Sequence, residues 1–181
     1  MSNIKIAFFH GLESPAVSDK TEFLNANFDD VYAPPMDYQR NANLFEQVLK
    51  EVKERKISLL VGSSMGGYFA YCISTLTGIP ALLFNPAVHS RSINPPVRMG
   101  THSAKLTIVL GINDDVILPG KTVEFFKTEG IGNSVIMYEQ NDHRTPIYIF
   151  KKWIEKMTKN LHESEMKTFV EWLKETPSIQ K

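Results

Sequence analysis

The stretch ISLLVGSSMGGYFAY, which spans Ile57 to Tyr71, decides the fold of this chain. It begins as a short apolar run, turns at Gly-Ser-Ser-Met-Gly-Gly, and continues as a helix-forming sequence. The pattern Gly62-x-Ser64-x-Gly66 is typical of a nucleophile elbow, a strained turn that joins a strand to a helix and exposes a serine. Both glycines have a steric reason, because a Cβ at either position would obstruct the crossing backbones. We therefore predict a strand, a turn with Ser64 at its apex, and a helix from Met65.

The context of the pattern makes it informative. With glycine at about 7% of residues and serine at a similar share, a chance match is expected in about 6% of chains of this length. Here a β-rich apolar run lies directly before the pattern and a helix-like segment directly after it, which is the setting that an elbow requires. The helix that begins at Met65 would direct free backbone N–H groups and its positive dipole end at a developing oxyanion.

Apolar runs alternate with amphipathic segments along the rest of the chain. This order is typical of a mostly parallel sheet with helices on both faces. We therefore predict an α/β protein, a three-layer α/β/α sandwich with little or no cap. The expected strands are Ile4–Phe9, Val31–Ala33, Ile57–Val61, Ile79–Phe84, Lys105–Leu110 and Ser134–Tyr138; the expected helices are Ser18–Asn27, Asn43–Arg55, the segment after Ser64, Pro119–Glu129, Thr145–Lys159 and Ser164–Thr176.

Length and charge limit the classes of function. A chain of 181 residues is expected to form one domain over residues 1–181 and to bury about 70% of its unfolded surface. Lys plus Arg and Asp plus Glu number 20 each, so no net field favours nucleic acid or an anionic membrane as a partner. The single cysteine, Cys72, and the absence of a signal-like or long apolar segment lead us to expect a cytoplasmic protein.

A serine nucleophile needs a base, and the base needs a carboxylate that orients it. In the order expected after an elbow, the acid precedes the histidine. Asp114 follows one predicted strand and lies 50 residues after Ser64, and His143 follows the next strand, 29 residues further on. Strand ends of a parallel sheet meet at one edge, so we predict a Ser64, His143 and Asp114 triad, with His143 as the general base.

Alternatives remain at the acid position and in the neighbouring loops. Asp115 competes with Asp114, which the Gly-x-x-Asp spacing from Gly111 favours. Asp142 is expected to face solvent or to cap the following helix. For the oxyanion hole we predict the backbone N–H groups of Met65 and Leu12.

Residues near the first strand and in the long loop are candidate substrate contacts. His10 and Gly11 end the first predicted strand, although the His10 ring also suits a structural role in tying down its loop. His89 and His102 lie in an irregular stretch, residues 86–104, that we expect to overlie the pocket of Ser64. Exposed loop histidines without a role remain the alternative for both. Neither a metal nor an organic cofactor is expected.

The sequence VGSSMGGYFAYCISTLTGIPALLFNPAV, from Val61 to Val88, together with the preceding strand and its His10-Gly11 end, resembles the YqiA-type esterases of the UPF0227 family. These are compact members of the α/β-hydrolase superfamily. The close similarity covers roughly the first ninety residues, while Asp114 and His143 match the family's acid and base by position. The chain departs from the family at Gln140-Asn141-Asp142, where glycines are usual, and in a shorter segment between Val88 and Lys105.

The resemblance implies an α/β-hydrolase fold and hydrolysis of short-chain acyl esters. The residues predict the same class, a serine carboxylesterase that acts on a small-molecule ester through an acyl-enzyme. Two alternatives stay open: a non-catalytic ligand-binding protein on this fold, and an acyltransferase or peptidase that uses the same triad. The sequence leaves the oligomeric state and the natural substrate undetermined.

Overall fold

The computed structural model describes residues 4–91, 105–130 and 133–175. Within these residues a six-stranded sheet has the order β2-β1-β3-β4-β5-β6, and every neighbouring pair is parallel. The structure confirms the predicted parallel sheet, and the strand bounds differ from the predicted ones by one or two residues. The strands are β1 (Ile6–Phe9), β2 (Val31–Tyr32), β3 (Leu59–Ser63), β4 (Ala81–Phe84), β5 (Leu106–Gly111) and β6 (Ser134–Glu139).

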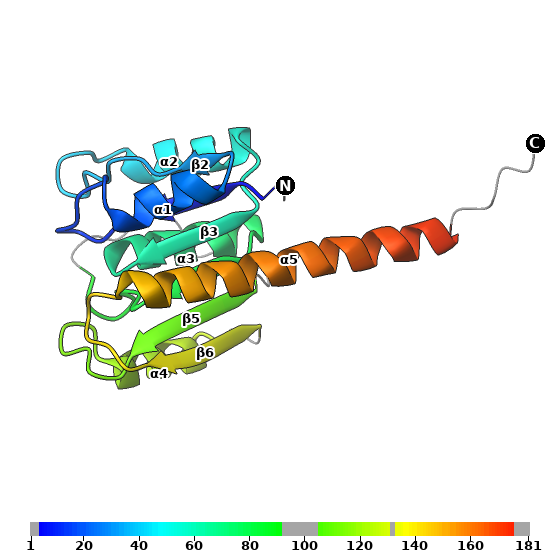
Figure 1. Cartoon of the computed structure of the whole chain (residues 1–181). Helices are drawn as coiled ribbons and strands as arrows, with labels where there is room; N and C mark the ends of the chain where they lie inside the picture. The colour runs from blue at the N-terminus through cyan, green and yellow to red at the C-terminus, as the bar shows by residue number, and fades with distance from the viewer. Residues whose placement is uncertain (1–3, 92–104, 131–132, 176–181) are drawn as a thin grey trace, which may run out of the picture.

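Helices cover both faces of the sheet, as the alternation predicts (Figure 1). Apolar side chains of α1 and α5 pack on one face, around the fully buried Leu24 and Phe150. Those of α2, α3 and α4 pack on the other face, where the amphipathic stripe of α2 places Val48 and Val52 in the core. The helices are α1 (Asp19–Asn27), α2 (Leu44–Glu54), α3 (Met65–Thr77), α4 (Pro119–Thr128) and α5 (Ile147–Glu175).

The strand order reverses direction between β1 and β3. From β1 the chain crosses to β2 on one side, and after β3 it continues through β4, β5 and β6 on the other. In open α/β sheets ligands bind outside the carboxyl ends of the strands at such a switch point. Here those two ends carry His10-Gly11-Leu12 and Ser64, so the topology brings the predicted oxyanion loop next to the predicted nucleophile.

The two elbow glycines allow the backbones to approach closely. A Cβ on Gly62 would lie 2.2 Å from the carbonyl oxygen of Gly66. A Cβ on Gly66 would lie 2.0 Å from the carbonyl oxygen of Phe9, in β1. Both contacts are with backbone atoms, which cannot move aside as a flexible side chain can. The steric reason expected from the sequence therefore holds at both positions.

The last helix differs from the prediction. Thr145–Lys159 and Ser164–Thr176 were expected as two helices, but residues Ile147–Glu175 form the single helix α5. Neither glycine nor proline occurs between residues 159 and 164, so no residue there breaks the helix. Leu161, in the expected gap, packs against the core cluster of α1 and α5. Figure 1 shows the second half of α5 extending beyond the sheet.

Among the helices of the described residues, none qualifies as a candidate membrane span.

Candidate active site

Ser64 lies between β3 and α3 in a strained conformation. Its φ of 56° and ψ of −118° are unusual for a residue with a Cβ. The turn is fixed by backbone hydrogen bonds: the Ser64 N–H donates to the Phe84 carbonyl at 2.9 Å, and the Ser64 carbonyl accepts from the N–H groups of Tyr68 and Ala87. The elbow is thus anchored to β4 and to the first turn of α3, which holds the hydroxyl clear of the sheet.

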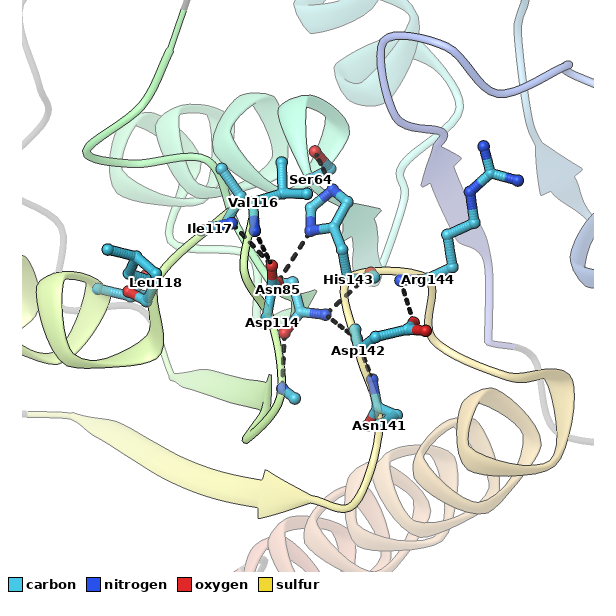
Figure 2. Close-up of polar contacts among 12 residues, drawn as sticks. Ser64, Asn85, Asp114, Val116, Ile117, Leu118, Asn141, Asp142, His143 and Arg144 are labelled. Atoms are coloured by element: carbon cyan, nitrogen blue, oxygen red, sulfur yellow. Dashed lines mark hydrogen bonds and ion pairs between the residues drawn. The ribbon is translucent and has the colours of Figure 1, made fainter.

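His143 connects Ser64 with Asp114 (Figure 2). The Ser64 hydroxyl lies 3.0 Å from Nε2 of His143, and Nδ1 of the same ring lies 2.8 Å from Oδ2 of Asp114. An ionised carboxylate can only accept, so the Nδ1–H donates to Asp114 and the lone pair of Nε2 is left to accept from the serine. The three side chains come from the ends of β3, β5 and β6, as predicted.

Asp114 is held by backbone amides. Its Oδ1 accepts from the N–H groups of Val116 at 2.9 Å and Ile117 at 2.7 Å, and none of its side chain is exposed, against 21% of the His143 side chain. These two bonds supply the partners that a buried carboxylate requires. Of the two aspartates considered, Asp114 is the one that contacts His143, while Asp115 is exposed.

The loop after β1 approaches Ser64 from the side of the predicted oxyanion hole. A Cβ on Gly11 would lie 3.3 Å from the Cβ of Ser64, so this loop packs directly against Ser64. The N–H of Leu12 makes no hydrogen bond to another residue of the described ranges. Met65 is the first residue of α3, so its N–H has no acceptor within the helix. Both groups can therefore donate to an oxyanion at Ser64.

His10 has a structural position in that loop. Its Nδ1 donates to the carbonyl of Gly11 at 2.8 Å, and its Nε2 accepts from the N–H of Met36 at 3.0 Å. The ring lines the cavity, but both of its nitrogens are occupied by backbone groups. The carbonyl of Gly11 and the N–H of Leu12 belong to one peptide plane and point in opposite directions. The bond from His10 therefore orients the Leu12 N–H. Tyr38, whose pKa burial raises, donates from its hydroxyl to the His10 carbonyl at 2.5 Å.

Asn85 is a positioning residue that the sequence analysis missed. Its Oδ1 accepts from the Gly111 N–H at 2.7 Å, and its Nδ2 donates to the carbonyls of Asp142 and His143 at 3.2 and 3.0 Å. The side chain thereby ties the ends of β4 and β5 to the loop that carries His143. In the sequence, Asn85-Pro86 only follows the expected strand Ile79–Phe84. The available signal in the sequence was an asparagine before a proline at the end of an apolar run. In the structure this asparagine has a φ of 43°, in the left-handed region that asparagine tolerates.

The remaining predicted contacts lie further from Ser64. The Nε2 of His89 is 3.2 Å from the Leu118 carbonyl, and His89 is not among the residues that line the cavity at Ser64. His102 and most of the stretch expected to cover the pocket lie outside the described residues. Asp142 is exposed and accepts from the Arg144 N–H at 2.9 Å.

A cavity of about 520 Å³ opens at Ser64, in the size range of small-molecule sites. The loop after β1 lines it on one side, Ala87, Val116 and Ile117 line it on another, and His143 and Arg144 also border it. No group of three or more His, Cys, Asp or Glu side chains able to hold a metal ion occurs within the described ranges.

Comparisons with known proteins agree with this architecture. A family model, described as an uncharacterised protein family (UPF0227), matches residues 5–174. Comparison with curated proteins gives no significant match.

Several solved structures have a similar fold. An esterase from Pyrococcus furiosus has 14% sequence identity and a TM-score of 0.66, with 90% of this chain and 83% of that chain covered. An alpha/beta hydrolase enzyme from a lagoon-sediment metagenome of Mar Chica, Morocco, has 15% identity and a TM-score of 0.63, with 92% of both chains covered. The Zea mays acyl-protein thioesterase 2 has 14% identity and a TM-score of 0.59, with 87% and 94% covered. The chain thus has the α/β-hydrolase fold.

Proposed function

Since the chain belongs to the uncharacterised family UPF0227, whose model matches residues 5–174, we propose that it is a serine hydrolase that cleaves small or short-chain carboxylic esters. The observation that carries the proposal is the hydrogen-bonded series from the Ser64 hydroxyl through His143 to the buried carboxylate of Asp114. Names of proteins with a similar fold, an esterase and an acyl-protein thioesterase, support acyl transfer to water as the reaction class.

In the first half-reaction, the Oγ of Ser64 attacks the carbonyl carbon of the ester while its proton passes to Nε2 of His143. The negative charge that develops on the carbonyl oxygen is stabilised by the N–H groups of Leu12 and Met65. Asp114 stabilises the imidazolium and keeps its Nδ1 protonated. When the tetrahedral intermediate collapses, the C–O bond to the alcohol breaks and His143 returns the proton to the departing oxygen.

The second half-reaction repeats these steps with water. His143 takes a proton from a water molecule, whose oxygen attacks the carbonyl carbon of the acyl-enzyme. Collapse of the second tetrahedral intermediate breaks the bond to Ser64, whose Oγ receives the proton from His143. The products are a carboxylic acid and the free enzyme, and neither half-reaction includes a redox step.

The cavity supports the expected substrate size. Its volume of about 520 Å³ lies in the lower half of the usual range for small-molecule sites. The described strands all belong to one sheet, which supports one α/β-hydrolase domain over residues 1–181.

The test is hydrolysis of 4-nitrophenyl esters of increasing acyl length by the wild type, Ser64→Ala and Ser63→Ala. Ser63 also borders the cavity and is the matched control. We expect the wild type and Ser63→Ala to hydrolyse short esters, and Ser64→Ala to lose about 10⁴-fold or more in kcat. A folded wild-type protein without turnover, or equal rates in wild type and Ser64→Ala, would contradict the proposal.

A further inference from the structure

Two cationic side chains line the cavity that opens at Ser64. Lys20 is the second residue of α1, and Arg144 directly follows His143. Among the described residues, no carboxylate lies within 4.0 Å of the ammonium group of Lys20 or the guanidinium group of Arg144. Several other basic side chains form ion pairs, for example Lys152, whose Nζ lies 2.6 Å from Oε1 of Glu139.

The ammonium group of Lys20 lies against a buried aromatic cluster. Its Nζ is 5.8 Å from the ring centroid of Phe150, which contacts Phe8 at 5.4 Å between centroids. Burial lowers the pKa of Lys20, Asp19 acts to raise it, and the positive charge of Arg144 lowers it further. Burial is the largest of these causes, and the carboxylate of Asp19 offsets it only in part. The first turn of α1 adds to this, because the positive end of a helix dipole disfavours a cation.

The guanidinium group of Arg144 is available to a ligand. Figure 2 shows its side chain directed away from Asp142, whose carboxylate accepts only from the Arg144 backbone N–H among the residues drawn. Arg144 is exposed, and its positive charge acts on Lys20 across the same wall of the cavity. An anion bound near both groups would relieve their repulsion and compensate both charges.

Resting on the function proposed above, we propose that the substrate ester carries an anionic group, a carboxylate or a phosphate, which binds to Lys20 and Arg144 while Ser64 attacks the ester carbonyl. Arg144 is adjacent to the base, so this group would lie on the His143 side of the cavity. The exposed carboxylates of Glu13 and Asp19 also border the cavity. These two carboxylates balance the two positive charges at the cavity. Recognition of an anion therefore depends on direct contact with Lys20 and Arg144 rather than on a net positive potential of the cavity.

Three acetate esters of matched shape test the inference: 4-acetoxybenzoate, 4-acetoxyphenylphosphonate and the neutral methyl 4-acetoxybenzoate. The readout is the ratio of kcat/KM for each anionic ester to that for the neutral one, after subtraction of spontaneous hydrolysis. In the wild type we expect a ratio of about ten or more for at least one anion, equivalent to one good charge-assisted contact. A higher ratio for the phosphonate indicates a phosphate ligand, and a higher ratio for the benzoate indicates a carboxylate.

Substitutions test whether Lys20 and Arg144 cause the preference for anionic esters. In the double variant Lys20→Met/Arg144→Gln the ratio should fall to about three or less, and added salt should lower it in the wild type. Lys121→Met is the matched control, since Lys121 is exposed on α4, on the other face of the sheet. The ratio of kcat/KM values measured for Lys121→Met should equal that of the wild type. Equal rates for anionic and neutral esters in the wild type, or an unchanged ratio in the double variant, would overturn the inference and leave the hydrolase proposal intact.

A binding measurement separates the two proposals if no ester is hydrolysed. Calorimetry with the Ser64→Ala protein compares the affinity for the same three esters, with and without the Lys20 and Arg144 substitutions. Tighter binding of an anionic ester that is lost with the two cations supports the inference even if turnover fails. Equal affinities for the anionic and neutral esters overturn it.

Discussion

Replacing Asn85 with alanine should destabilise the protein strongly, although Asn85 does not touch the reacting atoms. Its side chain makes three hydrogen bonds, to the buried Gly111 N–H and to the carbonyls of Asp142 and His143. A buried N–H without an acceptor costs about 1–3 kcal/mol, and each lost bond to a carbonyl about 0.5–1.5 kcal/mol. Alanine at a φ of 43° adds about 1–2 kcal/mol.

The free energy of unfolding should therefore fall by about 3–8 kcal/mol, a large part of the 5–15 kcal/mol that is usual for a domain. One kcal/mol corresponds to about 2–4 °C in a chain of this size, so the Tm of Asn85→Ala should fall by about 6 °C or more. Because Asn85 also holds the His143 carbonyl, esterase activity measured well below the Tm should decrease as well. Thermal unfolding followed by circular dichroism measures the first effect, and kcat/KM the second.

Two further variants separate the loss of hydrogen bonds from the strain of alanine at a positive φ. Asn85→Gly also removes the three bonds but accepts the positive φ, so it should be about 1 kcal/mol more stable than Asn85→Ala. Asn113→Ala, at an exposed asparagine in the neighbouring loop, should stay within about 0.5 kcal/mol of the wild type. A Tm of Asn85→Ala within about 2 °C of the wild type would refute the reasoning from buried hydrogen bonds.

Three other perturbations have defined outcomes. Asp114→Asn should lower kcat by about 10⁴-fold with little loss of fold, because an amide donating to Nδ1 of His143 places the proton on Nε2; retained activity would contradict this. The thiol of Cys72, whose pKa burial raises to about 12, should react with Ellman's reagent only after unfolding. Burial acts to raise the pKa of Glu139, but hydrogen bonds from the Lys152 ammonium group and the Trp153 indole lower this pKa overall. Glu139→Gln should therefore cost about 1–3 kcal/mol at neutral pH, measured by urea unfolding, and this cost should disappear as the pH falls through the folded-state pKa of Glu139.

Much of the fold could be predicted because local signals and global order agree. Buried parallel strands appear as continuous apolar runs, and the elbow glycines reveal the close approach of β1, β3 and α3. The positions of Ser64, Asp114 and His143 follow from one rule, that the ends of parallel strands meet at one edge. In the structure His143 lies within hydrogen-bonding distance of both Ser64 and Asp114.

The features that sequence reasoning missed depend on distant contacts. The bonds of Asn85 join residues 26, 57 and 58 positions away, and no local pattern contains them. The continuity of α5 is consistent with the lack of glycine and proline at residues 159–164, and the packing of Leu161 on a core that includes β1, β3 and β4 appears only in the fold. The charges of Lys20 and Arg144 are far apart in the chain and look like ordinary surface charges, until the fold places both on the wall of one cavity.

Whether Ser64 is the nucleophile is tested by covalent labelling with a fluorophosphonate, followed by intact-mass and peptide mass spectrometry. We expect one label per wild-type chain, located on Ser64, with the same labelling in Ser63→Ala and none in Ser64→Ala. His143→Ala should react far more slowly, because the base that activates the hydroxyl is gone. A folded wild-type protein that takes no label, or takes it on another residue, would contradict the assignment of Ser64 as the nucleophile.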